Sequence, residues 1–155
     1  MADTMNAVAE RIVAGADDAI IVADREGVIR LWNAAAERIL GFPADQALGA
    51  TLDLIIPEKH RDVHWRGYDK VMETGQTKYA GSLLAVPALT ADGSRISVEF
   101  TVNLIFDDNG DVEGIAAIMR DVTERFQEQR ALRRELADLR ARAAGSSQEP
   151  ASPAD

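Results

Sequence analysis

The sequence predicts an α+β fold in which five short strands and several helices form one domain, with a further helix at each end. Two β-rich runs near the N-terminus are followed by a stretch of helical periodicity. Three more strand-like runs then follow, separated by Ala91-Asp92-Gly93 and Asp107-Asp108-Asn109-Gly110, which are strong hairpin signals. A chain of 155 residues is long enough for one sizeable core and short for two.

The first part of the chain predicts a helix and a hairpin. Residues 5–14 form an amphipathic pattern, with their bulky apolar side chains on one side of a short helix. The runs 19–24 and 27–32 read as two strands joined by a tight turn, in which Gly27 permits a positive φ.

The middle of the chain predicts several helices. Residues 33–41 have helical periodicity and end at a glycine. Pro43 is suited to the first turn of a short helix, and Thr51 to capping another through Leu54. A longer helix is expected over 57–73, with Gly75 ending it.

Three strands are expected over 78–90, 94–106 and 111–121. The second alternates apolar and polar side chains with period two, so one set of alternate residues should face solvent. That set comprises residues 95, 97, 99 and 101.

The C-terminal part returns to a helical pattern whose apolar positions follow coiled-coil spacing over barely two heptads. These positions are Leu132, Leu136, Leu139 and Ala143. From Gly145 the composition is typical of a disordered tail. The predicted organisation is 1–15 cap helix, 16–121 folded domain, 122–144 coiled-coil helix and 145–155 disordered tail.

Composition excludes several functional classes. The net charge of −9 argues against binding to nucleic acid or to an anionic membrane. The absence of cysteine excludes disulfides, cysteine zinc sites and flavin–cysteine photochemistry. Neither a signal peptide nor a long apolar run is visible, so we expect a cytoplasmic protein.

No catalytic motif is visible either. The sequence has no glycine-rich phosphate loop and no recognisable Ser/His/Asp set, and its carboxylates are scattered, so we do not expect an enzyme. His60 and His64 have the spacing of zinc ligands, but the nearby glutamates do not complete a metalloprotease pattern.

The order of elements and several motifs together resemble the PAS family of sensory domains, over about residues 8–126. The motifs are Asp24-Arg25-Glu26-Gly27-Val28-Ile29, Trp32-Asn33-Ala34-Ala35-Ala36-Glu37-Arg38, Leu40-Gly41-Phe42, Asp92-Gly93-Ser94 and Arg120-Asp121-Val122-Thr123-Glu124-Arg125. The resemblance implies a five-stranded antiparallel sheet in the order 2-1-5-4-3, with helices over one face and a ligand pocket between. It also implies that the Asp-Val-Thr segment couples the sheet to the outgoing helix, which Asp121 or Thr123 can cap.

A narrower resemblance concerns the segment from Pro57 to His64, which is similar to the histidine helix of rhizobial haem-PAS oxygen sensors. It implies haem b ligated by His64. It further implies propionate contacts from Lys70 and Lys78, and a distal side lined by Tyr79, Leu84, Phe100 and Val102. Two positions depart from those sensors: Leu84 replaces an arginine that would hydrogen-bond a bound diatomic gas, and the tyrosine after the ligating histidine is displaced by one, to Tyr68.

The residue pattern around His64 leaves two interpretations open. His64, Gly67, Tyr68 and Val71 share one helix face, where a neutral imidazole could hold iron and the glycine could leave room for a flat macrocycle. Alternatively, His64 is hydrogen-bonded to backbone, or faces solvent on a helix whose core face is Val63, Val71 and Met72. We expect Trp32 in the core and Trp65 at the pocket's edge or in a dimer contact.

Three functional hypotheses follow. The first is a sensory module that binds a small cofactor, haem b through His64, and passes the state of a small ligand or diatomic gas to the helix 122–144, acting through a homodimer or a separate signalling protein. The second is a cofactor-free PAS dimerisation module that uses residues 1–14 and 122–143. The third is a gas-binding haem protein without signalling output.

Overall fold

A computed structural model describes residues 2–79 and 81–146 of the chain. The chain divides between Val122 and Thr123 into two compact units. The first unit contains the sheet and five helical segments, and the described part of the second is one helix.

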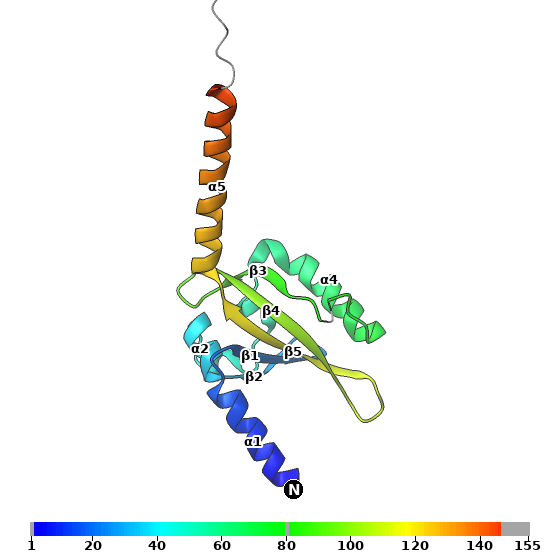
Figure 1. Ribbon diagram of the computed structural model, residues 1–155. Helices are drawn as coiled ribbons and strands as arrows, with labels where there is room; N and C mark the ends of the chain where they lie inside the picture. The colour runs from blue at the N-terminus through cyan, green and yellow to red at the C-terminus, as the bar shows by residue number, and fades with distance from the viewer. Residues whose placement is uncertain (1, 80, 147–155) are drawn as a thin grey trace, which may run out of the picture. The chain divides into compact units, whose positions relative to one another are not determined.

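The first unit is built on a five-stranded antiparallel sheet in the order β2-β1-β5-β4-β3, which confirms the predicted α+β fold and strand order. β5 lies at the centre, between β1 and β4 (Figure 1). The strands are β1 Ala19–Asp24, β2 Ile29–Trp32, β3 Leu84–Leu89, β4 Arg95–Phe106 and β5 Val112–Asp121.

Helical segments connect β2 to β3 and precede β1. Asn33 begins α2 by accepting a hydrogen bond from the Ala36 amide, and Gly41 ends it with a φ of 80°. α4 starts after Pro57 and ends at Gly75, as predicted. The segments are α1 Ala2–Gly15, α2 Ala34–Leu40, α3 Ala44–Ala47, the 3-10 turn η1 Leu52–Leu54 and α4 Glu58–Thr74.

Three local expectations were wrong. The strand predicted over 78–90 begins only at Leu84, because residues before it form a turn in which the Ser82 amide donates to the Tyr79 carbonyl. β2 begins at Ile29 rather than 27, since the φ of 76° at Gly27 belongs to the turn. Among the described contacts, the Thr51 side chain makes no capping hydrogen bond to η1.

One large core lies between the sheet's inner face and α2 and α3. It includes the fully buried Ile29, Leu40 and Val98. Trp32 belongs to it, as expected, and its indole N–H donates to the Phe42 carbonyl at 3.0 Å. This cluster of apolar side chains fixes the inner face of the sheet, on which any pocket must be built.

The period-two pattern of β4 is present in the structure, but its outer side is less exposed than expected. Val98 is buried on the inner face, and Arg95 is exposed. Ser97, Glu99 and Thr101 are half-buried. β4 has a neighbouring strand on each side, so side chains on its outer face are partly covered by those of β3 and β5.

The described part of the second unit is α5, Thr123–Ser146. None of its residues through Ser146 is buried within the chain. The disordered tail was expected from Gly145, but Gly145 and Ser146 are helical. The rest of the predicted tail, residues 147–155, lies outside the described part. No helix in the described ranges is long and apolar enough to span a lipid bilayer.

Candidate functional site

α4 presents one face to a second, smaller core cluster at the other end of the sheet. This cluster contains the buried Ala23, Tyr68, Met72 and Val112, with Trp65 packed against it. The alternative core face of Val63, Val71 and Met72 is right in part, because Met72 is buried and Val71 is half-buried, but Val63 is 65% exposed. The reason is geometric: Tyr68 and Met72 are four residues apart and define a stripe. At about 100° per residue, Val63 lies roughly 140° around the helix from Tyr68 and about 180° from Met72, on the opposite side.

Trp65 is held by the turn between β1 and β2. Its indole N–H donates to the Asp53 carboxylate at 2.8 Å. Its ring lies so close to Gly27 that a Cβ added there would come within 2.2 Å of it. Trp65 thus fixes α4 against the hairpin and the 3-10 turn, and a glycine is required at the contact for both space and its positive φ.

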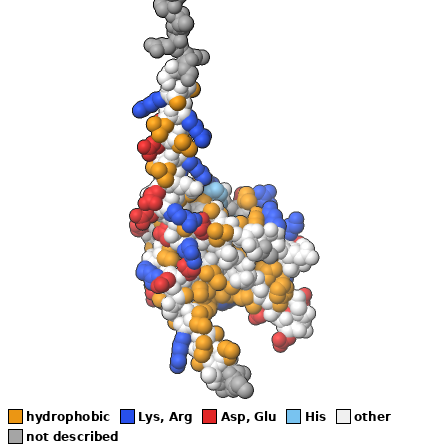
Figure 2. All heavy atoms as spheres, in the orientation of Figure 1, with side chains coloured by type: hydrophobic (Ala, Val, Ile, Leu, Met, Phe, Trp, Pro, Cys, Tyr) orange, Lys and Arg blue, Asp and Glu red, His pale blue; other side chains and the backbone are white. Residues whose placement is uncertain are grey.

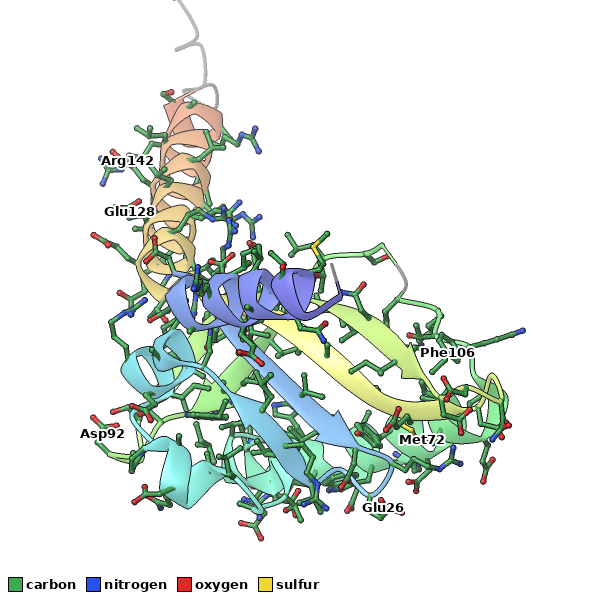
Figure 3. The ribbon with its side chains drawn as sticks, turned by 90° about the horizontal axis from the view of Figure 1, so that it is seen from below. Glu26, Met72, Asp92, Phe106, Glu128 and Arg142 are labelled. Atoms are coloured by element: carbon green, nitrogen blue, oxygen red, sulfur yellow. The ribbon has the colours of Figure 1, made fainter. Side chains whose placement is uncertain are left out.

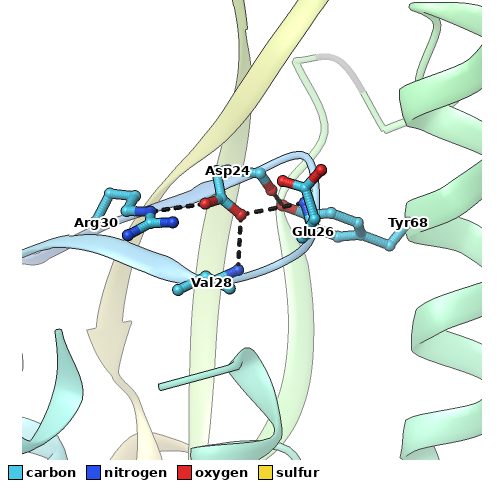
Figure 4. A network of polar contacts seen from close by, with 5 residues as sticks. All are labelled: Asp24, Glu26, Val28, Arg30 and Tyr68. Carbon is cyan, nitrogen blue, oxygen red and sulfur yellow. Dashed lines mark hydrogen bonds and ion pairs between the residues drawn. The ribbon is translucent and has the colours of Figure 1, made fainter. Parts of the chain in front are cut away.

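Tyr68 is fixed by the same turn. Its hydroxyl donates to the backbone carbonyl of Asp24, while the Asp24 carboxylate accepts hydrogen bonds from the Val28 amide and the Arg30 guanidinium (Figure 4). Burial raises the pKa of the Asp24 carboxyl, but these hydrogen bonds outweigh it and the pKa is lowered. Burial also raises the pKa of the Tyr68 phenol. The phenol therefore stays protonated and donates its hydrogen bond to the Asp24 carbonyl.

His64 lies beside these two aromatic side chains. Its ring centre is 4.9 Å from that of Trp65 and 5.6 Å from that of Tyr68. Nδ1 is buried and has no hydrogen-bond partner among the described residues. Burial lowers the pKa of the imidazole, and the nearby Asp53 carboxylate opposes this only in part.

One requirement of a haem ligand is met at His64. An imidazole is a ligand only when neutral, which is the form that burial favours here. Gly67 is exposed, and a Cβ added to it would meet no described atom within 4 Å, so the helix surface next to His64 is open. His64 was alternatively expected to be hydrogen-bonded to backbone. Within the described part of the chain, no such bond is made by Nδ1.

The other predicted ligand residues lie in three places. Leu84 pairs with Phe100, and Val102 follows on the same inner face of β4, where Phe100 packs against the large core. The Lys78 ammonium lies 4.9 Å from the centre of the Tyr79 ring, on the segment before β3. Lys70 is exposed on α4.

Asp53 and Arg25 were missed by sequence reasoning. Both lie in turns, where charged residues are usually solvated, and no local pattern marks a turn residue that reaches another element. Asp53 accepts from Trp65, and Arg25 donates to carbonyls of α4 and β5. Within residues 2–79 and 81–146, no group of three or more His, Asp or Glu is placed to hold a metal ion.

Comparison with known proteins identifies the class of protein that this fold and helix define. The sequence matches the PAS fold family over residues 13–127, and the chain therefore belongs to that family. It is 37% identical over 118 residues to an uncharacterized protein of Azorhizobium caulinodans and 27% identical over 122 residues to the sensor protein FixL of Bradyrhizobium diazoefficiens. The matches cover 76% and 79% of this chain but only 16% and 24% of those proteins.

Solved structures share the fold. A PAS domain from Colwellia psychrerythraea superposes with a TM-score of 0.68 at 22% identity, covering 77% of this chain and 98% of that one. An RNA-binding light-oxygen-voltage receptor superposes with a TM-score of 0.71, also at 22% identity, covering 87% of this chain and 38% of that one. These superpositions show that the chain shares its fold with both structures.

Proposed function

We propose that this chain is a sensory PAS module that binds haem b through His64, between α4 and the inner face of the sheet. The observation that carries the proposal is the half-buried His64, whose neutral form is favoured by burial, on a helix whose sequence resembles that of haem-PAS sensors. The similarity to FixL, a sensor protein, supports the sensory class.

In this proposal His64 supplies Nε2 to the iron, and the open helix surface at Gly67 accommodates the macrocycle. Lys70 and Lys78 contact the propionates, and Tyr79, Leu84, Phe100 and Val102 line the distal side. Tyr68 holds α4 in position through its bond to Asp24. When bound, haem supplies an iron atom that takes a diatomic gas or changes redox state.

The direct test is a haemin titration of the purified protein, followed by visible absorbance. We expect a Soret band in the wild type and its loss or a large shift in His64→Ala. His60→Ala is the matched control, because His60 is exposed one turn earlier on the same helix, and it should leave the band unchanged. The haem proposal is removed if the wild type shows no Soret band, or if the band of His64→Ala is the same as that of the wild type.

The distal side should hold oxygen weakly, because Leu84 offers no hydrogen-bond donor. Leu84 lies opposite Phe100 in the sheet. We expect Leu84→Arg to slow oxygen dissociation from the reduced protein at least tenfold, measured by stopped-flow absorbance. An unchanged rate would mean that this side chain does not face the bound gas. Reversible gas binding without any effect on oligomerisation would favour the gas-binding protein without output.

The second candidate function is cofactor-free dimerisation, and exposed apolar side chains favour it. Met5, Val8 and Ile12 are exposed on α1, and apolar side chains gather along α1 and over the adjoining face of the first unit (Figure 2). Leu132, Leu136 and Leu139 are 47–66% exposed on α5. A second copy of the chain is the natural cover for a helix with this spacing, and in the sensory proposal the same dimer, or a separate signalling protein, receives the signal.

Light scattering distinguishes these candidates. Leu136→Asp should at least double the fraction of monomer, whereas Ala137→Asp, off the seam on the same helix, should not. A dimer that forms without haemin and is insensitive to it favours the cofactor-free module. A wild type that is monomeric with and without haemin contradicts dimerisation and leaves a separate protein as the receiver.

A further inference from the structure

Arg25, in the turn between β1 and β2, joins two elements that are distant in the sequence. One guanidinium nitrogen, Nη1, donates to the carbonyl of Val112 at 2.6 Å, and the other, Nη2, reaches the carbonyl of Met72 at 3.4 Å. Met72 lies in the last turn of α4, and Val112 is the first residue of β5. A single side chain thus bridges the end of the histidine helix and the start of the central strand.

The chemistry of this contact suits an arginine. Carbonyls in the last turn of a helix lack amide partners within it and carry the negative end of the helix dipole, so a cation there is favoured. The planar fork of arginine can donate to two carbonyls at once, whereas a lysine ammonium on a flexible stem holds no such fixed geometry. The contact between Arg25 and Val112 is short enough to be a strong, charge-assisted hydrogen bond.

The two elements that Arg25 joins are neighbours in space. A Cβ added to Gly75 would lie 3.6 Å from Val112 and 3.9 Å from Phe106, so the end of α4 lies against the β4–β5 hairpin (Figure 3). A Cβ added to Gly114 would lie 2.5 Å from the carbonyl oxygen of Ala23, so β5 and β1 approach closely there. The end of α4 and the start of β5 are thus neighbours in space, and β5 is in turn held closely against β1.

We infer that Arg25 is a positioning residue that couples α4 to β5. Apolar side chains can slide past one another, whereas the two hydrogen bonds of Arg25 are directional and fix the end of α4 relative to the start of β5. β5 runs to Asp121, two residues before α5 begins. A role for this coupling in signalling rests on the proposed function, because the stimulus would then enter at His64 on α4.

The coupling can be tested without haem, through a substitution that stabilises α4 alone. Gly67→Ala, on the exposed surface of α4, should slow amide hydrogen exchange in that helix about fivefold. In an otherwise wild-type chain the amides at the start of β5 should slow as well, by at least twofold. In Arg25→Ala and Arg25→Lys backgrounds the helix should still respond to Gly67→Ala, and β5 should not.

Arg30→Ala is the matched control, since Arg30 lies after the same turn and pairs only with Asp24 in the described contacts. It should leave the response of β5 intact. An equal response of β5 in the Arg25→Lys background, or its loss in the Arg30→Ala background, overturns the inference.

A second experiment tests signalling by repeating the amide hydrogen exchange measurement with haemin. Haemin should alter exchange in β5 of the wild type, and Arg25→Lys should reduce this change at least threefold while the haemin Kd stays within twofold. A wild type that binds no haemin refutes the proposed function, and the Gly67→Ala measurement then decides the role of Arg25. A wild-type response of β5 to haemin that persists in full in Arg25→Lys refutes the coupling.

Discussion

The two ends of the sheet carry cores of different kinds. Beside α2 and α3, the large core is formed by apolar side chains, with Ile29, Leu40 and Val98 fully buried. Beside α4, the small core is interleaved with polar contacts, namely Tyr68 to Asp24 and Trp65 to Asp53. The first is held mainly by apolar packing, with one indole hydrogen bond from Trp32, whereas the second lies beside a titratable ring and contains several directional bonds that can be broken singly. The free energy of unfolding should therefore depend most on the large core, and the response to a bound ligand on the small core.

The largest effect should come from the large core. Leu40→Ala removes a fully buried side chain at the end of α2 and should lower the free energy of unfolding by about 3 kcal/mol. Urea denaturation followed by circular dichroism measures it. If Met72→Ala in the small core costs more than Leu40→Ala, the contrast between the two ends is wrong.

A smaller loss should follow at the contact between α4 and the hairpin. Gly27→Ala places a Cβ in the Trp65 ring at a φ of 76°, which should cost roughly 2–3 kcal/mol. Gly93→Ala is the matched control, because its φ is 82° but its Cβ would meet no described atom within 4 Å, so it should cost roughly 1 kcal/mol. Thermal unfolding of both variants checks the difference, and equal losses would show that Trp65 does not press on the turn.

Tyr68→Phe isolates one hydrogen bond of the small core. It removes the donor to the Asp24 carbonyl, which keeps a second bond from the Gly27 amide, so the loss should be about 1 kcal/mol. Denaturant unfolding gives the stability, and hydrogen exchange in α4 shows where it is lost. Faster exchange confined to α2 would contradict the assignment of this bond to α4.

The smallest effect should be the pH dependence contributed by His64. Its pKa is lowered in the folded state, so the unfolded chain binds more protons, and the contribution is complete above the unfolded pKa and lost as pH falls through the folded value. Between pH 7 and 5 the wild type should lose more stability than His64→Gln, by less than about 1 kcal/mol. Parallel pH profiles for the two proteins would indicate that the ring is solvated.

The sequence alone determined the order of elements, because turns and helix ends depend on local chemistry. Gly27, Gly41, Gly75 and Gly110 all adopt the positive φ expected of them. The alternating pattern of β4 predicted which residues face outward, and Val98, which lies between two of them, is fully buried.

Tertiary structure alone decided which side of α4 is buried and what fastens it. α4 carries polar and apolar residues on several sides, so its own pattern did not separate a face with Val63 from one with Tyr68. The turn between β1 and β2 determines which side of α4 is buried, because Gly27 leaves room for the Trp65 indole and the Asp24 carbonyl accepts a hydrogen bond from Tyr68. The reach of Arg25 to two carbonyls was likewise invisible, because contacts between residues 47 and 87 positions apart leave no periodic trace in the chain.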